Sequence, residues 1–290
     1  NWKSGNCKTT YLCGHTDSVY CLQFDEHKII TGSRDRTIRF WDLHTYRCLA
    51  IVASPAFEAR SHGIDNWATT TSDHSATSTT APPLDGAPGG DEDGEGRHSK
   101  TRVSRIEPKV YRHAMHHAAS ILCLQYDNEI LVTGSSDCTV IVHSMKAPHT
   151  PLFRLRQHKQ AVLDVAFDAK HIVTASKDNC IGVFSRTTGA LLNMFRGHTA
   201  PVNSVQINGS SIVSCSGDFS VKLWSLESGT CIREFEGHTK GLACSQLSAD
   251  GKYIASAGND KIIRVWDAHT GACVKSVPAH EGLIRSLYWD

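Results

Sequence analysis

The chain has 290 residues, which is enough for one large all-β domain or for two ordinary domains. Hydrophobic residues make up 40% and charged residues 20%, and the net charge of +1 lacks the positive excess typical of nucleic-acid or anionic-membrane binders. No apolar run approaches the roughly 18 residues of a spanning helix, and residues 1–10 contain no signal-peptide-like stretch. We therefore expect protein partners, with no nucleic acid or membrane, in the cytoplasm, the nucleus or both.

The first predicted unit occupies residues 1–53. A polar lead-in precedes a strand candidate at 8–13, and Gly14-His15 follows. Alternating residues predict strands at 28–33 and 37–41, the second ending in Trp41-Asp42, and an outer strand at 47–52. We assign this region to a lead-in, a candidate closing strand and one four-stranded repeat.

The next region, residues 54–110, has a different composition. It lacks periodicity, is rich in Ser, Thr, Pro and Gly, and contains an acidic run at 91–95. Such a segment buries too little apolar surface to fold, so it predicts a disordered insertion. The basic residues that follow the acidic run allow two interpretations, a docking or modification segment and a solvated stretch of mixed charge.

Residues 111–290 contain further units with a regular period. Successive histidines from His117 to His280 lie 41, 40, 40 and 42 residues apart, the period of a four-stranded propeller blade. In the first four units an Asp follows the His by 20 residues, and in the fifth by 22. The repeated residues are His15, Asp35, Trp41, His117, Asp137, His158, Asp178, His198, Asp218, Trp224, His238, Asp260 and Trp266.

The recurring His, Asp and hydroxyl could be read as a catalytic triad. A triad is needed only once, however, whereas this set occurs in five units, with Thr31, Thr133, Thr174, Ser214 or Ser256 four residues before the Asp. Because buried polar groups must be paired, we expect one structural hydrogen-bond network per unit. No catalytic residue is assigned.

Two units depart from this pattern. His143 and Phe184 stand where an indole N–H should close the network, so we expect their blades to be less tightly fixed. His113, His116 and His117 suggest a metal site, but His117 belongs to the repeat and no paired Cys lies near. We expect no metal and no cofactor, and we interpret the scattered cysteines as reduced core residues.

The carboxyl end repeats the beginning of a unit. Residues 280–290 match residues 15–25, after which the sequence ends, so we expect five full repeats, the start of a sixth, and a truncated ring. The predicted strands 8–13 and 283–289 would then present unpaired edges, which favour association.

The sequence resembles the WD-repeat family over nearly everything outside the insertion, on its Gly-His, turn-Asp and Trp-Asp positions. The resemblance implies an all-β propeller. The segments 1–7, 14–24, 132–140 and 237–245 are most similar to the propeller half of F-box/WD-repeat proteins. In that family an F-box, absent here, holds the adaptor of a cullin-RING ubiquitin ligase, and the propeller captures the protein substrate.

The same resemblance implies a site that reads acidic or phosphorylated segments. Arg34, immediately before a turn Asp, and Arg285, five residues after a repeat histidine, match phosphate-reading positions of the family, and Lys177 is a weaker match. Tyr20 and Asn203 also lie five residues after a histidine and complete the predicted substrate-binding set. Arg suits this role because its planar fork forms bidentate bonds with phosphate, although ordinary solvated loop charges remain the alternative.

Two other functions remain open. A WD-repeat scaffold of transcription, signalling or RNA processing would need the same fold and no link to ubiquitin. An enzyme is disfavoured, since we find no Gly-rich phosphate loop, no paired metal ligands and no singular nucleophile outside the repeat.

Overall fold

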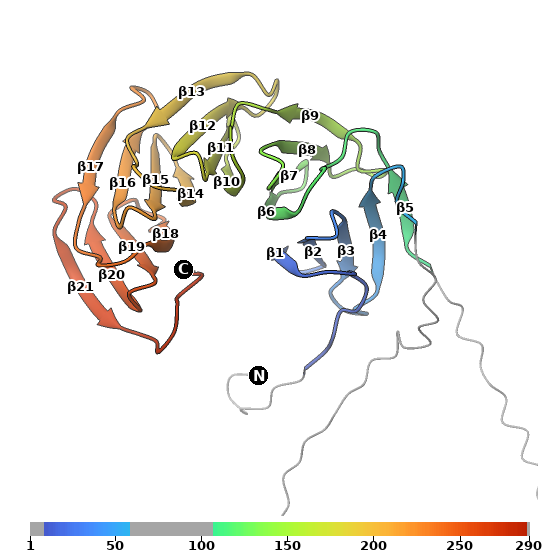
Figure 1. The fold of residues 1–290 in the computed structure, drawn as a ribbon, viewed down its shortest axis with the longest axis horizontal. Coiled ribbons are helices and arrows are strands. Elements are labelled where there is room, and N and C mark those ends of the chain that lie inside the picture. The colour runs from blue at the N-terminus through green and yellow to red at the C-terminus, as the bar shows by residue number, and fades with distance from the viewer. Residues whose placement is uncertain (1–8, 59–106, 289–290) are drawn as a thin grey trace, which may run out of the picture.

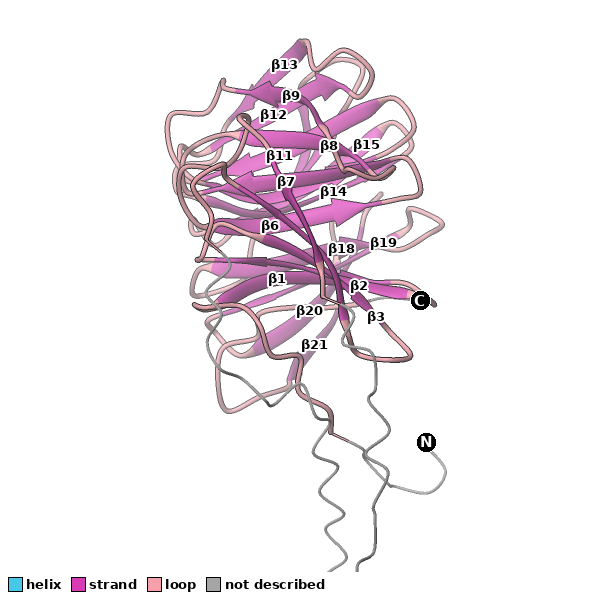
Figure 2. Ribbon diagram, turned by 90° about the vertical axis from the view of Figure 1, so that its right-hand side faces the viewer, coloured by secondary structure: helices cyan, strands magenta, loops and turns pink. Residues whose placement is uncertain are grey.

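The computed structural model describes residues 9–58 and 107–288. Within these ranges the chain forms 21 strands joined by loops, and Figure 2 shows no helix among them. The described segments therefore include no helix long and apolar enough to cross a membrane. The strands form five sheets, here called blades one to five, which lie side by side along an arc (Figure 1).

Each blade has four antiparallel strands that pair in chain order, with the first nearest the centre of the arc (Figure 1). Blade one begins with β1 (Val19–Phe24), β2 (Lys28–Ser33), β3 (Ile38–Asp42) and β4 (Cys48–Ala53). Blade two comprises β6 (Ile121–Tyr126), β7 (Ile130–Ser135), β8 (Val140–Ser144) and β9 (Pro151–Leu155). Blade three comprises β10 (Val162–Phe167), β11 (His171–Ser176), β12 (Cys180–Ser185) and β13 (Leu191–Arg196).

The last two blades follow the same plan. Blade four comprises β14 (Val202–Asn208), β15 (Ser211–Ser216), β16 (Val221–Ser225) and β17 (Cys231–Phe235). Blade five comprises β18 (Leu242–Leu247), β19 (Tyr253–Gly258), β20 (Ile262–Asp267) and β21 (Cys273–Pro278). The second strands of blades two, three and four are almost wholly buried, because each of these blades packs between two neighbours.

Blade one has a fifth strand that the sequence did not predict. Strand β5 (Lys109–Arg112) pairs in parallel with β4, with Ala50 opposite Lys109. Two residues assigned to the insertion therefore belong to a sheet, and the insertion's predicted end at 110 is corrected to before Lys109. Most of the predicted insertion, residues 59–106, lies outside the described residues.

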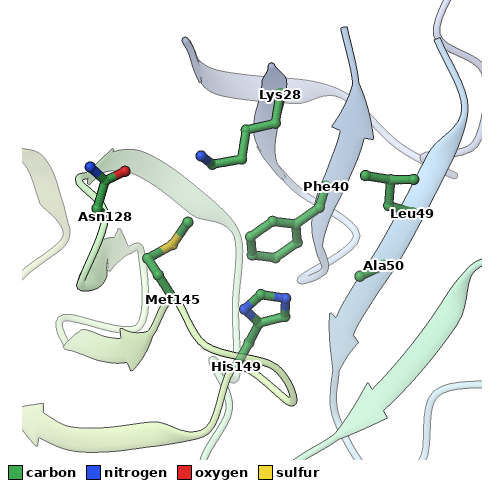
Figure 3. A pocket seen from close by; sticks show the side chains of 7 residues that line it. All are labelled: Lys28, Phe40, Leu49, Ala50, Asn128, Met145 and His149. Carbon is green, nitrogen blue, oxygen red and sulfur yellow. The ribbon is translucent and has the colours of Figure 1, made fainter. Parts of the chain in front are cut away.

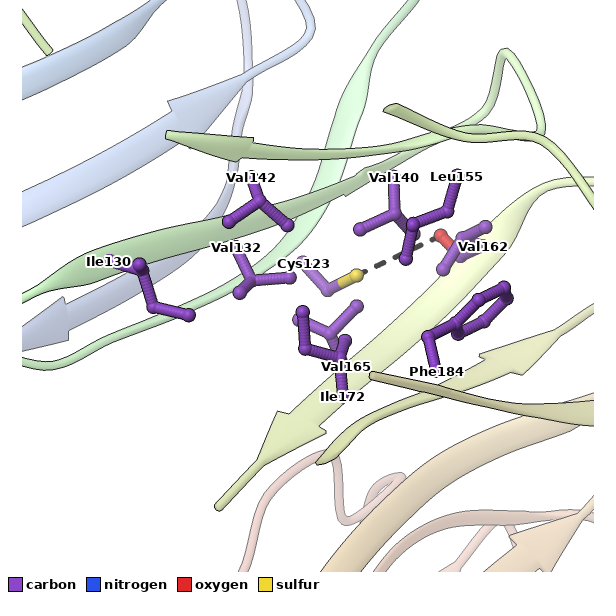
Figure 4. Close-up of a cluster of buried hydrophobic side chains, with 10 residues drawn as sticks. All are labelled: Cys123, Ile130, Val132, Val140, Val142, Leu155, Val162, Val165, Ile172 and Phe184. Carbon is purple, nitrogen blue, oxygen red and sulfur yellow. Dashed lines mark hydrogen bonds between the residues drawn. The ribbon is translucent and has the colours of Figure 1, made fainter. Parts of the chain in front are cut away.

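Apolar side chains fill the seams between blades. Figure 4 shows the seam of blades two and three, where β-branched residues from both blades surround the Cys123 thiol. Val162 and Ile172 are fully buried there, and Phe184 fills the outer part of the seam. All ten cysteines within the described ranges are free; five are buried as predicted, whereas two are half-buried and Cys13, Cys231 and Cys273 are exposed, so the prediction of core residues is wrong for these three.

The ring of blades is open, as Figure 1 shows. Residues 9–13 form no strand, and Lys8 lies outside the described residues. Residues 283–288 also form no strand, although Ile284 donates its N–H to the Gly258 carbonyl at 3.2 Å and packs on blade five. Both edge-strand predictions are therefore wrong, because no described strand pairs with either segment along its length.

Candidate functional site

The repeated polar residues form a buried hydrogen-bond network, seen in full in blade one. The Trp41 indole N–H donates to the Thr31 hydroxyl at 2.9 Å, and this hydroxyl lies 2.7 Å from His15 Nε2. His15 Nδ1 is 2.8 Å from the Asp35 carboxylate. A neutral imidazole protonated on Nδ1 satisfies all of these groups, because it accepts from Thr31 and donates to Asp35.

The other four blades repeat the His–Asp and His–hydroxyl contacts. The histidine Nδ1 lies between 2.6 and 3.1 Å from the Asp carboxylate, in the pairs His117–Asp137, His158–Asp178, His198–Asp218 and His238–Asp260. Trp224 and Trp266 close two of these networks through hydrogen bonds of 2.8 Å to serine hydroxyls. His143 Nε2 is buried without a partner in blade two, and Phe184 offers no donor in blade three.

The networks hold the turn carboxylates in their ionised form. Burial opposes ionisation of Asp35, but the hydrogen bonds that the carboxylate accepts from His15, Thr37 and Thr16 outweigh it, so the pKa of Asp35 lies well below its usual value. Burial likewise opposes ionisation of the other four, but hydrogen bonds from the histidines lower the pKa values of Asp137, Asp218 and Asp260, and the backbone N–H of Lys159 followed by His158 lowers that of Asp178. These groups take part in the same buried hydrogen-bond network in every blade.

The same aspartates bring two kinds of loop together at one end of the arc. Asp35 accepts backbone N–H groups from Thr16, in the loop before β1, and from Thr37, after its own turn. The residue before each turn Asp also donates its N–H to a carbonyl in that loop. The donors are Arg34, Ser136, Lys177, Gly217 and Asn259. We call this end of the molecule, formed by the loops before the first strands and the turns after the second, the turn-Asp end.

A central hollow of about 520 Å³ opens between the innermost strands. All six residues that stand five positions after a repeat histidine line it: Tyr20, Leu122, Leu163, Asn203, Ala243 and Arg285. Tyr20 is 51% exposed and offers an aromatic surface, whereas the Asn203 amide donates to the Leu242 carbonyl at 2.6 Å. Three predicted substrate-binding residues, Tyr20, Asn203 and Arg285, therefore share one hollow.

The other two predicted binding residues lie beside the hollow and not in its lining. Arg34 is exposed on the turn after β2, where its Nε lies 3.6 Å from the Asp17 carboxylate. Lys177 is exposed on the equivalent turn of blade three, which places it at the same end. Arg285 reaches this end from a different direction, because its segment packs on blade five beside Gly258.

The turn-Asp end carries more positive charge than the sequence analysis recognised. Its exposed cations are Arg34, Arg36, Arg156, Lys159, Lys177, Arg196, Lys240, Lys261 and Arg285. Apart from the turn aspartates that the histidines hold, its acidic residues in the same loops are Asp17, Glu236 and Glu281. The signal for the missed residues was their unit position, since Arg36 and Lys261 both follow a turn Asp directly.

Arg36 and Lys261 share an unusual backbone conformation. Every residue that follows a turn Asp has a φ between 67° and 75°, including Phe219, whose side chain is 46% exposed. L residues other than Asn and Asp seldom adopt this left-handed conformation. The hydrogen bonds of the turn Asp impose it, and the side chains of these residues are thereby fixed at the edge of the turn-Asp end.

Asp164 is a half-buried carboxylate in the wall of the hollow that the sequence analysis also missed. It accepts the N–H of Val165 and, across the seam to blade four, that of Val205, both at 2.9 Å. Burial raises its pKa to about 6, although these bonds and the Ser204 hydroxyl oppose the rise. Other units carry Cys or Ser at this position, so a lone Asp was the available signal.

The thiols of the hollow are poor nucleophiles. Burial raises the pKa of Cys21 to about 12 and that of Cys244 to about 11, and it holds the pKa of Cys123 well above its usual value. The thiolate is the reactive form, and the raised pKa values keep these thiols protonated at neutral pH. They serve as small packing residues between the first strands.

The histidine cluster at 113–117 does not converge. His113 contacts the Pro148 carbonyl, His116 contacts the carbonyls of His113 and Ala114, and His117 belongs to the network of blade two. Within residues 9–58 and 107–288, no group of three or more His, Cys, Asp or Glu side chains is arranged to hold a metal ion.

The repeat spacing and the blade geometry agree with a known family. The profile of the WD domain, G-beta repeat, matches residues 5–42, 109–144, 149–185, 189–225 and 229–267. The chain belongs to the WD40 repeat family. Its fold is similar to the WD40 β-propeller domain of Doa1, with a TM-score of 0.66, 19% identity, and coverage of 95% of this chain and 73% of that one. The prediction of an all-β propeller with five full repeats is thereby confirmed.

Several curated relatives are F-box/WD-repeat proteins, as the resemblance implied. F-box/WD repeat-containing protein 9 of Bos taurus is 30% identical over 205 residues, which are 66% of this chain and 40% of that protein. The probable E3 ubiquitin ligase complex SCF subunit sconB of Arthroderma benhamiae is 56% identical over 45 residues, 16% of this chain and 7% of that protein. The chain thus spans less than half the length of these relatives.

Proposed function

We propose that this WD40 chain is a non-catalytic module that binds an acidic or phosphorylated segment of another protein at its turn-Asp end. The observation that carries the proposal is the gathering of exposed Arg and Lys side chains around the hollow that Tyr20, Asn203 and Arg285 line. Arg34 is the only one of these cations with an acidic partner among the described residues. An anionic segment would supply the missing charge.

We further propose that the partner is a substrate of a ubiquitin ligase, and that the chain acts as the recognition part of an F-box/WD-type receptor in the cytoplasm or nucleus. The support is the similarity to F-box/WD repeat-containing protein 9 and to proteins named as SCF subunits. Contact with a ligase adaptor would require an F-box outside this chain.

The test compares Arg34→Ala and Arg285→Ala with the original chain in binding the captured partner, before and after phosphatase treatment. Losing a desolvated bidentate contact should cost about 2 to 5 kcal/mol of binding free energy, whereas losing a peripheral charge mainly changes the association rate and its salt dependence. Lys252→Ala is the matched control. Lys252 is an exposed cation on the turn between β18 and β19, which lies at the end of the molecule opposite the turn-Asp end.

We expect both arginine variants and the dephosphorylated partner to bind more weakly, and Lys252→Ala to bind like the original chain. If all of them bind equally well, the charge-reading function is wrong and a scaffold without phosphate recognition takes its place.

A further inference from the structure

The seam between blades one and two differs from the other three seams in one facing pair of residues. In those three seams a side chain of the outermost strand faces a glycine in the turn between the third and fourth strands of the next blade. The pairs are Phe153 with Gly189, Asn193 with Gly229, and Arg233 with Gly271. A β-carbon added to any of these glycines would lie within 3.0 Å of the facing side chain, and all three have a φ between 69° and 82°.

At the first seam the sizes of this pair are reversed. Ala50 occupies the position of Phe153, since it pairs with Phe40 of β3 as Phe153 pairs with Val142 of β8. His149 occupies the position of Gly189, because each directly precedes the residue that closes the last turn of its blade. His149 also keeps the left-handed conformation, with a φ of 57°, which glycine adopts far more readily than an L residue.

The imidazole of His149 builds one wall of a hollow. It stacks on the Phe40 ring at 4.1 Å between centroids with an interplanar angle of 13°, and the Tyr111 ring approaches it edge-on at 5.5 Å. His149 Nδ1 is buried and has no hydrogen-bond partner. The ring is therefore held in a strained turn by aromatic contacts, without a hydrogen bond to that nitrogen.

Because Ala50 is small, the space that a larger residue would fill stays empty and forms a hollow of about 310 Å³. Figure 3 shows Phe40, His149 and Met145 around it, with the Lys28 amino group extending toward Asn128. Phe40 and Ala50 are buried at its base, whereas the His149 imidazole, the Met145 thioether and the Leu49 side chain offer surfaces that suit a flat apolar side chain.

Lys28 is the one cation among the described residues that line this hollow, and two further lysines adjoin lining residues. Lys28 is paired with Asp25 at 2.5 Å, but Lys109, which lies beside Ala50 in the register of β4 and β5, and Lys146, in the turn of His149, are exposed. Neither of these two lysines forms an ion pair within the described parts of the chain. The surroundings therefore favour an acidic ligand.

We propose that this hollow binds an acidic segment of a partner protein and takes up one aromatic side chain of that segment against Leu49, Met145 and His149. The carboxylates of the segment would face Lys109 and Lys146. The site lies among the turns between first and second and between third and fourth strands, at the end of the molecule opposite the turn-Asp end. It is therefore independent of the function proposed above.

The probe is a fluorescein-labelled peptide of sequence Glu-Glu-Trp-Glu-Glu, titrated with the full 290-residue chain and followed by fluorescence polarisation. Peptides with Ala for the Trp, or with Lys for every Glu, separate the apolar from the charged contribution. The diagnostic variant is the double substitution Ala50→Phe with His149→Gly, which reproduces the pair Phe153 and Gly189 of the next seam and should therefore fold. Its thermal midpoint, compared with that of the original chain, verifies this.

We expect saturable binding of the Trp peptide, and binding at least about tenfold weaker for the folded double variant and for both altered peptides. Lys252→Ala, an exposed cation of blade five outside this hollow, should leave the affinity unchanged. Three results would each overturn the proposal: no saturable binding to the original chain, equal binding by the double variant, or loss of binding in Lys252→Ala. Concentration-dependent dimerisation of the original chain that the double variant abolishes would also overturn it, in favour of a second copy as the occupant.

Discussion

At the scale of single residues, the residue at the position of the repeat tryptophan decides whether the buried hydroxyl of a blade accepts a hydrogen bond from an indole N–H. Trp41, Trp224 and Trp266 each donate an indole N–H to it. His143 stands at this position in blade two, and burial lowers its pKa to about 3, with the nearby His117 adding to the effect. His143 is therefore neutral in the folded chain at neutral and mildly acidic pH.

This buried histidine predicts a pH-dependent loss of stability. The unfolded chain protonates His143 below about 6.5, whereas the folded chain does not until about 3, so its contribution to the free energy of unfolding falls as the pH is lowered between these values. His143→Phe, which copies Phe184 of blade three, removes this contribution. Relative to the original chain, we expect the variant to gain about 2 kcal/mol on going from pH 7.5 to pH 5 in urea unfolding. An identical pH dependence of the two proteins would contradict this account.

At the scale of whole strands, a glutamine in the first strand of a blade holds the next blade in place. Gln23, Gln125 and Gln206 each accept an N–H from the first strand of the following blade, at 2.5 to 2.8 Å. Ala166 stands at this position in blade three, and Asp164, two residues earlier, makes the contact instead. The seam of blades three and four is therefore fixed by a carboxylate.

The consequence is a second pH effect, of opposite sign. The pKa of Asp164 is raised to about 6 from 3.8, so the charged form is penalised on folding, and the contribution of Asp164 to stability falls as the pH rises from about 4 to 6. The double substitution Asp164→Ser with Ala166→Gln copies Ser204 and Gln206 of blade four. We expect this variant to keep the seam and to lose that pH dependence, measured by urea unfolding at pH 4, 5, 6 and 7. A pH dependence equal to that of the original chain would exclude Asp164 as its source.

The sequence could predict the blades because their signals are local. The spacing from His to Asp and the alternation of apolar residues both lie within one unit, and the structure follows them in all five. Strand β5 was missed because it has four residues and pairs with β4 across the whole insertion, so no local pattern marks it. The segment 283–288 was wrongly predicted as a strand, since its pattern matches a first strand but no described second strand follows it.

In the candidate sites, too, some residues could be predicted from their position in the repeat unit and others could not. The residues five positions after each histidine could be placed together from unit position alone. The basic residues Arg36 and Lys261 were missed, although a unit alignment contains them. The reversed sizes of the facing residues Ala50 and His149 could not be predicted from the sequence, because they depend on a contact between different blades and on the conformation of a turn.

At the scale of the whole molecule, the open arc leaves one face of blade one uncovered. Val19, Leu22 and Phe24 of β1 are 46%, 61% and 65% exposed. Residues at the position of Val19 in the other blades, Ile121, Val162, Val202 and Leu242, are at most 1% exposed, since the preceding blade covers them. An apolar face of this kind favours association between molecules.

We expect the isolated 290-residue chain to self-associate through this face. The double substitution Leu22→Ser with Phe24→Ser should weaken association in sedimentation velocity while leaving the thermal midpoint nearly unchanged, because neither side chain is buried in the monomer. Leu247→Ser, at the buried equivalent of Phe24 in blade five, is the control and should lower the midpoint, since cavity-forming changes in a core typically cost about 2 to 5 kcal/mol. Undiminished association of the double variant would place the contact elsewhere.

We expect a partner protein to bind at the turn-Asp end and to contact the central hollow between the innermost strands. A photoreactive benzoylphenylalanine placed at Tyr20, which lines the hollow, tests this most directly. The same residue placed at Ile232, a similarly exposed position on the outer strand β17, is the matched control. The account predicts that the captured partner is cross-linked from Tyr20 through an acidic or phosphorylated segment, and not from Ile232. Cross-linking from Ile232 with none from Tyr20 would contradict it.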